Sequence, residues 1–559
     1  MRIKSVRRAC AVASVVVVAA GTPMAMAAVN SSSSPATSAT TGAAATSPLD
    51  TAGLPSTQQQ TNTLNSALTY MRANYKSLYQ NYGGDAVTAV FDYGIGSLWQ
   101  KGTDGAGTTI AVLEAWADPQ VQANTDSFFS TLHLPNPQIQ TIYPDGPLPS
   151  TCPAQTNKTT GSCASWEGEE DTDIDAIHLM APYAKILVAV TPPDSQEADD
   201  PASNGAPPEF MKSLETISSG HLANAISISA GNGESTYSEG ATEIHAQDPG
   251  ELAAAAAGIP VVAASGDSGV VEDLPTPYTD NGGYETTKTP GSNTWDDSPW
   301  VTAVGGTTLN MSSQTPTKLG ADPLWSQESA GYSSVYSRPS YQNGVSSAPM
   351  RSVPDISMDA EAGTSEAAPM LAGVLALATQ SNQGDLGPIN PALYGVLGPA
   401  GSRDGISDVV SGNNTMTVSP SGANGPTYIV QGYAAGPGFD VASGWGTVYT
   451  PNFVPALVTA TRASDQEAAS RAQAQSQLNQ LQHGATVTKT SSGNYYLNAS
   501  GLLPGHPAQL AIDGKTIATL TVNQLGDITY MIDPTQLKLG GGQHTVTLTS
   551  MLLTETGQF

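Results

Sequence analysis

Between Gly107 and about Pro455 the sequence alternates short apolar segments, typical of strands, with segments of helical periodicity. One helical segment, Gly250–Ala257, directly precedes the apolar segment Ile259–Ala264. Strands that alternate with helices form a largely parallel sheet, because each parallel strand needs a long crossover connection. The sequence therefore predicts an α/β domain, in which a loop that follows a strand is a usual place for a functional residue.

The two ends of the chain differ from this α/β region. Residues 28–62 are rich in Ser, Thr, Ala and Gln, a composition that buries too little apolar surface to fold. From Gly484 onward the chain reads as short alternating strands separated by turn residues, which predicts a small all-β, sandwich-like domain. The predicted organisation is a signal peptide at 1–27, a disordered leader at 28–62, a short helical segment at 63–103, the α/β domain at 104–461, a helical linker at 462–483 and an Ig-like β-sandwich at 484–559.

The first 27 residues have the three parts of a secretory signal. Met1–Arg8 is basic, an apolar run follows, and Ala25-Met-Ala27 supplies the small residues of a cleavage site. This pattern predicts cleavage after Ala27 and a secreted, extracellular protein. No other stretch predicts a membrane span.

The chain is strongly acidic, with 20 basic and 48 acidic residues and a formal net charge of −28. Without the signal peptide, 16 basic residues remain and the net charge is −32. Such a charge argues against nucleic acids and anionic membranes as partners. Because there are few Lys and Arg residues, protonation of the carboxylates in acid leaves little positive charge to destabilise the fold.

Two cysteines remain after removal of the signal peptide, which takes Cys10 with it. In an exported protein, Cys152 and Cys163, eleven positions apart, predict a disulfide that closes a short loop. Two cysteines with scattered histidines do not favour a zinc site.

The segment Gly363-Thr-Ser-Glu-Ala-Ala-Pro369 runs directly into the apolar stretch Met370–Ala378, which predicts a helix. Ser365 would then lie near the positive end of the helix dipole, beside small residues that let a substrate backbone approach. A Ser or Thr before an apolar run is also a common helix cap. The pattern alone therefore leaves two interpretations, a cap and a nucleophile.

Six carboxylates fall within the nine residues 167–175, in a segment that predicts a helix of three to four turns. At about 100° per residue, Glu169 and Asp173 share a face that is otherwise apolar. Two like charges on an apolar face repel each other and resist ionisation, so we expect a coupled pair with at least one raised pKa. Such a pair suits a general base that works in acid. We expect Glu170, Asp171 and Asp175 to face water.

Several stretches occur together in one order: Glu169-Glu-Asp-Thr-Asp173, Met180-Ala-Pro-Tyr-Ala-Lys-Ile186, Ala264-Ser-Gly-Asp-Ser-Gly269 and Gly363–Pro369. In this order they resemble the sedolisins, or serine-carboxyl peptidases, a family with a subtilisin-like fold. Further stretches agree with the same resemblance: Gly107–Leu113, Ser298–Thr307 and Val353–Ser357. The resemblance covers roughly Asp104 to Pro455.

The resemblance implies a role for each matching residue. Ser365 would be the nucleophile, Glu169 the base and acid that exchanges its proton, and Asp173 the partner that orients Glu169. Asp267 would be the acid that stabilises the oxyanion. A carboxyl group donates to an oxyanion only while it is protonated, so such a site works best in acid. As a bare pattern, Gly-Asp-Ser-Gly is also a common turn.

Two later stretches, Ser407–Asn414 and Gly436–Gly446, resemble the calcium loops of the same family. The resemblance implies one Ca²⁺ held by the carboxylates of Asp408 and Asp440 and by the backbone carbonyls of Val409, Gly436 and Gly438. Calcium takes oxygen ligands, including carbonyls, so Gly-rich loops with a few acids suit it. Without the resemblance these stretches would be taken for ordinary turns.

The chain departs from the family pattern in three places. Sedolisins are made with a long folded propeptide, whereas only about eighty residues lie here between the signal and Gly107. Nine residues separate Asp355 from Ser365, fewer than is usual in the family, so substrate preference on that side is not carried over. Ala230 stands where some members have a tryptophan that pairs with an acid matching Glu114, so a proton network through Glu114 is not carried over either.

The sequence thus predicts a secreted, acid-active, monomeric serine endopeptidase that hydrolyses polypeptides through an acyl-enzyme on Ser365. One alternative is an exported binding protein on the same scaffold with impaired catalysis. Another is an esterase that uses Ser365.

Overall fold

The computed structural model describes the chain from Leu49 to Phe559 with several gaps. The residues outside the description are 1–48, 83–84, 145, 149–162, 192–208, 238–239, 278–283, 419–426, 464–465, 482–484, 491–492, 500–501, 503–506, 523–527 and 551–552. The predicted signal peptide and Cys152 therefore lie outside the described residues. Cys163 is described and is buried at the start of a helix.

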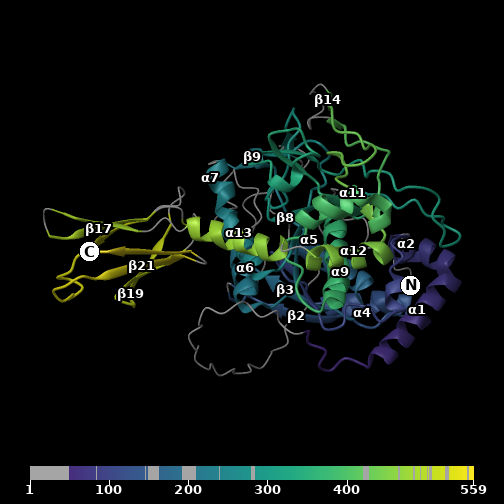
Figure 1. Ribbon diagram of the computed structural model, residues 1–559, viewed down its shortest axis with the longest axis horizontal. Helices are drawn as coiled ribbons and strands as arrows, with labels where there is room; N and C mark the ends of the chain where they lie inside the picture. Colours follow the sequence, from purple (N-terminus) through teal and green to yellow (C-terminus); the bar gives the residue numbers. More distant parts are fainter. Residues whose placement is uncertain are drawn as a thin grey trace, which may run out of the picture.

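A seven-stranded parallel sheet forms the centre of the molecule, which confirms the predicted α/β fold (Figure 1). Every pairing in this sheet is parallel. Its strands, in spatial order, are β11 (Ile356–Asp359), β8 (Val301–Thr307), β5 (Val261–Ala264), β4 (Ala225–Ile228), β1 (Thr109–Glu114), β3 (Lys185–Val190) and β2 (Gln138–Ile142).

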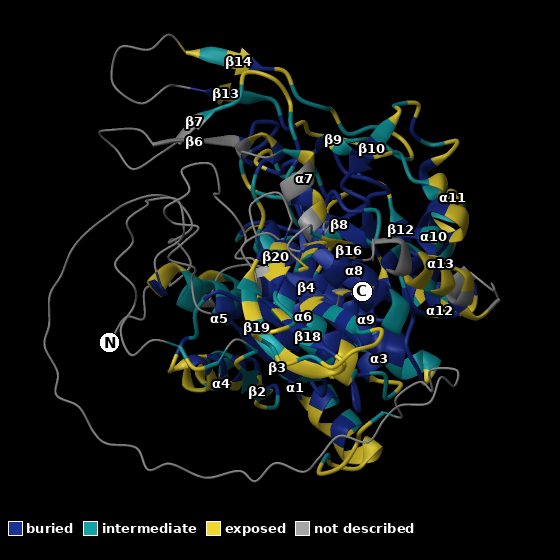
Figure 2. Ribbon diagram, turned by 90° about the vertical axis from the view of Figure 1, so that its left-hand side faces the viewer, coloured by how far each residue is buried: buried dark blue, intermediate teal, exposed yellow. Residues whose placement is uncertain are grey.

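Helices cover both faces of the sheet, because alternate strand residues point to opposite sides and most of them are apolar. One face packs against α5 (Cys163–Met180), α9 (Thr364–Asn382) and α12 (Thr450–Ala463). The other packs against α6 (Glu209–Gly220) and α8 (Asp248–Ala257). Figure 2 shows the central part of the molecule as mostly buried, and α9 and every strand of the sheet except the edge strand β2 consist mainly of buried residues. The remaining helices of this region are α4 (Val121–Leu132), α7 (Ala241–Ile244), α10 (Asn390–Ala392) and α11 (Gly398–Ala400).

Three N-terminal helices, α1 (Thr57–Tyr82), α2 (Asp85–Asp92) and α3 (Gly96–Trp99), pack on the same core as α5 and α9. Helix α1 begins six residues before the predicted boundary at residue 63. Ser56 and Gln59 explain the earlier start, because the Gln59 side chain accepts from the Ser56 N–H at 2.9 Å and the Ser56 hydroxyl accepts from the Gln59 N–H at 3.4 Å. This reciprocal pair is a capping box, which fixes where a helix begins.

Beyond α12, helix α13 (Gln466–Leu481) leads to two antiparallel sheets that pack face to face around one apolar core. This arrangement confirms the predicted all-β C-terminal region, which extends away from the α/β domain in Figure 1. The first sheet contains β16 (Thr486–Lys489), β17 (Tyr495–Ala499) and β20 (Ile528–Ile532). The second contains β19 (Lys515–Thr521), β18 (Pro507–Ile512), β21 (Thr545–Ser550) and β22 (Leu553–Gln558).

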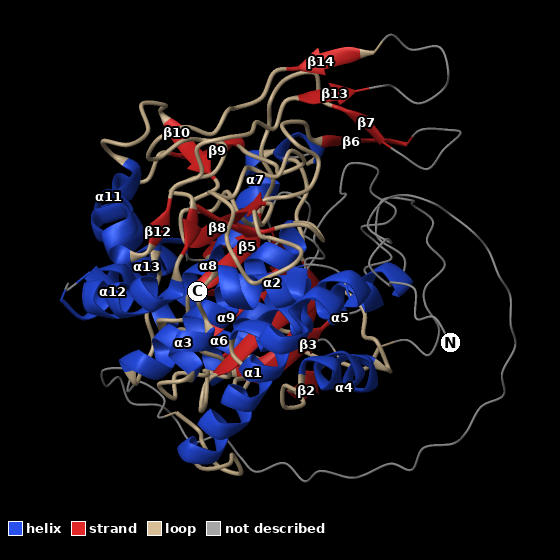
Figure 3. Ribbon diagram, turned by 90° about the vertical axis from the view of Figure 1, so that its right-hand side faces the viewer, coloured by secondary structure: helices blue, strands red, loops and turns tan. Residues whose placement is uncertain are grey.

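Short two-stranded sheets lie outside the main sheet, and Figure 3 shows two of them close together at the top of the view. These two are β6 (Asp273–Pro277) with β7 (Tyr284–Thr286), and β13 (Met416–Val418) with β14 (Tyr428–Val430). The others are β9 (Gly331–Ser337) with β10 (Met350–Val353), and β12 (Ile406–Ser407) with β15 (Thr447–Val448). Within the described ranges, no helix combines the length and the apolar character that crossing a membrane requires.

Candidate active site

Helices α5 and α9 lie against each other on one face of the sheet and bring the predicted nucleophile next to the predicted acids. A Cβ atom at Gly373 of α9 would lie 2.6 Å from Cβ of Met180 and 3.0 Å from the carbonyl oxygen of Ile177, both on α5. Glycine therefore allows the two helices to approach closely at this point.

Ser365 is the second residue of α9, and its hydroxyl hydrogen-bonds the carboxyl group of Glu169 on α5. Glu169 is half-buried, and the loss of hydration raises its pKa to about 7. The hydrogen bond to Ser365 lowers this pKa, whereas the nearby charge of Asp267 raises it. A carboxylate bonded to a serine hydroxyl in this way is placed to accept the serine proton.

Asp173, one helical turn after Glu169, is completely buried. Its Oδ1 accepts a hydrogen bond of 2.7 Å from the Ser229 hydroxyl. Burial and then the charge of Glu169 raise the pKa of Asp173 well above its usual range, so the two carboxyls titrate as one unit. Glu114, the last residue of β1, is buried beside this pair, and burial followed by the charge of Asp173 raises its pKa strongly. The structure thus places Glu114 against the pair although Ala230 stands in the tryptophan position.

Asp267 lies in the loop after β5 and contacts the first residue of α9. Its Oδ1 accepts hydrogen bonds from both the N–H and the hydroxyl of Thr364, each at 2.8 Å. The Thr364 hydroxyl accepts in turn from the Gly266 N–H at 2.9 Å. Oδ2 lies beside Gly363, where a Cβ atom would come within 2.5 Å of it. Although the residue as a whole is exposed, neighbouring protein atoms desolvate its carboxyl and raise its pKa.

One expectation about the acidic helix is wrong. Glu170 does not face water; it is completely buried, and its Oε2 accepts a hydrogen bond of 2.5 Å from the Asp118 N–H in the loop after β1. Burial raises the pKa of Glu170 to about 8. Asp171 and Asp175 are only half-buried, and Asp171 accepts a hydrogen bond from Asn124 on α4. The helical periodicity did not predict the burial of Glu170, because the loop that covers this face of α5 is distant in sequence.

The two predicted calcium loops lie together. The Asp408 carboxylate accepts from the Gly438 N–H at 2.9 Å, and the Asp440 carboxylate accepts from the Gly436 N–H at 2.8 Å. No Cβ at Gly436 or Gly438 would meet another atom within 4 Å, so this loop borders open space. Val409 is fully buried.

The donor types fit Ca²⁺, because both carboxylates contact the same loop, Asp408 at Gly438 and Asp440 at Gly436, and Ca²⁺ takes carboxylate and backbone carbonyl oxygens. In the described parts of the chain, no group of three or more His, Cys, Asp or Glu side chains could hold a metal. An ion at these loops would therefore take most of its protein ligands from backbone carbonyls.

Two residues of the site carry contacts that the sequence did not reveal. Thr364 was expected only to be small, yet it hydrogen-bonds Asp267 twice. Ser229 bonds Asp173 from the end of β4, a strand far from α5 in sequence. A polar residue directly after a short, fully buried strand was the available signal for Ser229.

Comparisons with known proteins agree with this geometry. The subtilase family model matches residues 151–392. Kumamolisin of Bacillus sp. (strain MN-32) is 27% identical over 387 residues, 64% of this chain and 61% of the relative. Sedolisin of Pseudomonas sp. (strain 101) is 29% identical over 371 residues, 61% of this chain and 56% of the relative. The chain thus spans about six tenths of the length of these curated relatives.

A solved structure of Pseudomonas sedolisin, described as a serine-carboxyl proteinase complexed with two molecules of pseudo-iodotyrostatin, superposes with a TM-score of 0.50. Its sequence identity is 26%, and the match covers 63% of this chain and 92% of that one. The motifs, the fold and these relatives lead to one assignment. They support the sedolisin family, the serine-carboxyl peptidases with a subtilisin-like fold, as the group of proteins that this chain resembles in sequence and fold.

Proposed function

We propose that this protein is a secreted, acid-active serine-carboxyl endopeptidase that hydrolyses polypeptides through an acyl-enzyme on Ser365. The observation that carries the proposal is the hydrogen bond between the Ser365 hydroxyl and Glu169, a carboxyl whose pKa is raised to about 7. A serine hydroxyl is a weak nucleophile unless a neighbouring base removes its proton. Ionised Glu169 is that base.

In the first half of the reaction, Ser365 Oγ attacks the carbonyl carbon of the scissile peptide bond while its proton moves to Glu169. Protonated Glu169 then gives this proton to the leaving amine, and an acyl-enzyme remains on Ser365. Glu169 and Asp173 share one proton, because two adjacent charges are costly in a buried place, so the pair carries a single negative charge that serves as the base. In the second half, water repeats the attack with Glu169 again as base.

The attack turns the carbonyl oxygen into an oxyanion, which needs a hydrogen-bond donor. Oδ1 of Asp267 already accepts two hydrogen bonds from Thr364, so a proton on this carboxyl belongs on Oδ2. Protonated Oδ2 would donate to the oxyanion. Activity therefore requires Asp267 to be protonated and Glu169 to be ionised. The first condition makes the rate fall as the pH rises, and the second makes it fall in strong acid.

The calcium loops complete the proposal. Asp408, Asp440 and the carbonyls of Val409, Gly436 and Gly438 would hold one Ca²⁺, whose role would be to stabilise these loops. The Asp440 carboxylate also accepts hydrogen bonds from the backbone N–H groups of Gly436, Ala442 and Ser443, which fix its place in the loop.

The test is turnover of an acid-denatured protein between pH 3 and 5 by the wild type, Ser365→Ala and Glu169→Gln. The alanine should abolish turnover, and the glutamine should lower it by at least about 100-fold, because an amide keeps the shape but accepts no proton. If both variants match the wild type in a pure sample, the serine-carboxyl mechanism is wrong. Turnover of esters without peptides would support the esterase, and a folded wild type with no turnover would support the binding protein.

A further inference from the structure

Ser229, the residue that follows β4 at the centre of the sheet, touches both halves of the site. Its hydroxyl lies 2.7 Å from Oδ1 of Asp173 on α5 and 3.3 Å from the backbone carbonyl oxygen of Ser365 on α9. Only 8% of the residue is exposed, so water does not compete freely for these contacts.

We propose that Ser229 is a positioning residue of this site, whose hydroxyl fixes the Asp173 carboxyl beside the first turn of α9. The inference rests on the proposed peptidase function and adds a residue to it. Ser229 touches neither the scissile bond nor the attacking oxygen, so it acts through Asp173 and Ser365.

The hydroxyl carries one proton, and this limits what it can do. While Asp173 Oδ1 is an acceptor, Ser229 donates to it over the shorter distance. Oδ2 of Asp173 is buried and has no hydrogen-bond partner among the described residues. A proton held by Asp173 therefore belongs on Oδ2. In this way Ser229 determines which oxygen of Asp173 can share a proton with Glu169.

The direction of the effect follows from the charges around Asp173. Glu169 and Glu170 on α5 and Glu114 at the end of β1 are the carboxyls that act on it, and all of them oppose its ionisation. From the facing helix α9 comes the Ser365 carbonyl, which is also negative in character. The hydrogen bond from Ser229 opposes the effect of these negative groups, because it stabilises negative charge on the Glu169 and Asp173 pair. Removing it should make the pair hold its proton to higher pH.

The experiment compares kcat and KM of the wild type, Ser229→Ala, Ser229→Thr and Ser227→Ala on one peptide between pH 2.5 and 8. Ser227 is the matched control: it lies two residues earlier on β4, is fully buried, and its hydroxyl has no partner among the described residues. A hydrogen bond to a charged group is worth roughly one pKa unit, so at a pH below the optimum Ser229→Ala should lower kcat about tenfold. Its optimum should move up by about half a pH unit, since the optimum is the mean of two limiting pKa values of which one shifts. KM should stay nearly constant.

Threonine keeps the hydroxyl and should restore both kcat and the optimum, whereas Ser227→Ala should leave both unchanged. The inference would be overturned if Ser229→Ala kept the optimum and kcat of the wild type. It would also be overturned if Ser227→Ala lowered kcat and moved the optimum as Ser229→Ala does. A fall in kcat without a shift of the optimum would also overturn it, because loss of packing alone predicts that result.

Carbon-13 NMR of the Asp173 carboxyl in the Ser365→Ala protein separates this inference from the proposed function. The titration midpoint should move upward when Ser229 is replaced by alanine, whether or not the wild type cleaves peptides. A shifted midpoint without turnover in the wild type would support the Ser229 contact and contradict the peptidase. An unshifted midpoint with normal turnover would contradict Ser229 alone.

Discussion

Among single residues, Asp267 has two carboxyl oxygens with different surroundings. Thr364 occupies Oδ1 with an N–H and a hydroxyl, and Gly363 leaves room beside Oδ2. An asparagine in the same place would keep a carbonyl oxygen for Thr364 and put an NH₂ group where Oδ2 lies. It would therefore donate to an oxyanion at any pH.

We expect Asp267→Asn to retain measurable turnover and to lose much of the fall in rate toward neutral pH. In this variant the profile follows ionisation of the Glu169 and Asp173 pair alone, so the rate should rise with pH and level off near the pKa of about 7 of Glu169. The measurement is kcat/KM from pH 3 to 8.

The control is Asp267→Ala, which offers no donor and should lower kcat by about 100-fold to 1,000-fold with little change in KM. An Asn variant whose profile falls toward neutral pH as steeply as the wild type would contradict the donor role of Asp267.

The sequence could reveal Glu169 and Asp173 because their relation is local. Positions i and i+4 share a helix face whatever surrounds the helix. Glu170 shows the limit of that argument, since the loop carrying Asp118 buries it from a distant part of the chain. The contacts of Ser229 and Thr364 could not be predicted for the same reason, because they depend on how strands and helices are arranged in three dimensions.

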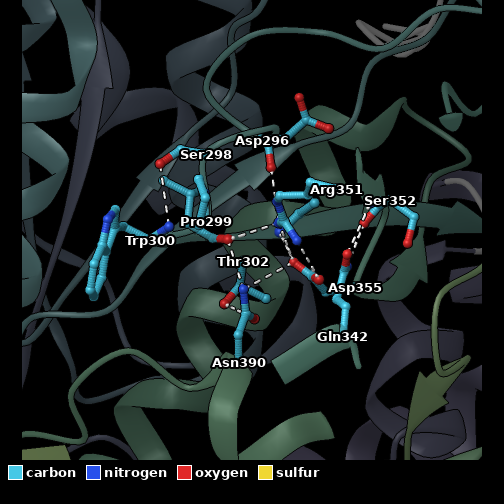
Figure 4. Close-up of polar contacts among 12 residues, drawn as sticks. Asp296, Ser298, Pro299, Trp300, Thr302, Gln342, Arg351, Ser352, Asp355 and Asn390 are labelled. Carbon is cyan, nitrogen blue, oxygen red and sulfur yellow. Dashed lines mark hydrogen bonds and ion pairs between the residues drawn. The ribbon is translucent and has the colours of Figure 1, made fainter. Parts of the chain in front are cut away.

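At the scale of elements, periodicity predicted that strands alternate with helices, and the parallel sheet confirms it. The start of α1 was misplaced because overall composition outweighed the local capping pair of Ser56 and Gln59. No pattern in the sequence could predict the polar cluster under β8 and β11, since its members are spread over about a hundred residues (Figure 4).

Arg351 is the centre of this cluster and is completely buried. It forms two hydrogen bonds with Asp355, at 3.0 and 2.7 Å, and donates to the backbone carbonyls of Asp296 and Val301 (Figure 4). Asp355 also accepts from the N–H of Ala303, so the pair joins the start of β8 to the start of β11. The cluster holds the strand that leads into the helix of Ser365.

We expect Arg351→Met to lower the free energy of unfolding by about 3–5 kcal/mol, because it leaves the Asp355 carboxylate buried without its counter-charge. Urea unfolding at pH 5 measures this. The double variant Arg351→Met with Asp355→Asn should recover part of the loss, since no bare charge remains. A single variant within about 1 kcal/mol of the wild type would show that the cluster contributes little.

The calcium loops lead to a prediction for the elements around β12 and β15. If an ion binds only to the folded chain, excess chelator at pH 6 should lower the melting temperature by about 5 °C. The loss should shrink as the pH falls, because protons compete with the metal ion for its ligands. Calorimetry and elemental analysis are the measurements.

Asp408→Asn should remove the response to chelator, whereas Asp404→Asn should keep it. Asp404 is a matched acid four residues earlier whose partner is exposed Arg403. Melting that chelator leaves unchanged, together with calcium-free protein, would contradict the calcium assignment.

In the whole molecule, the β-sandwich is joined to the α/β domain through α13, which packs on α8. Trp300 donates to Gln477 at 3.2 Å, and Arg471 donates to the Ala256 carbonyl at 3.2 Å. The sequence predicted a helical linker here but not its docking, because α13 has no strongly apolar stripe that would indicate a partner.

Buried carboxyls also link the whole fold to pH. The pKa of Asp104 is raised to about 6, that of Glu169 to about 7 and that of Glu170 to about 8, in each case mainly by burial. A carboxyl whose folded pKa is raised binds its proton more tightly in the native state. Its contribution to stability is complete below the unfolded pKa of about 4 and is lost as the pH rises through the folded value.

We therefore expect the free energy of unfolding to fall between about pH 4 and pH 8, with Glu170 as a large single contributor. Glu170→Gln removes the titrating proton and keeps the side-chain shape, so stability should depend less on pH, and the difference from the wild type should change by on the order of 3 kcal/mol across that range. Urea unfolding at pH 4, 6 and 8 measures it. Glu215→Gln, at a partly exposed carboxyl paired with Lys212, is the control and should leave the slope unchanged. Equal stability of the wild type at pH 4 and pH 8 would contradict this prediction. It would mean that the fold rearranges to hydrate the buried carboxyls when they ionise, because a rigid fold cannot ionise them without cost.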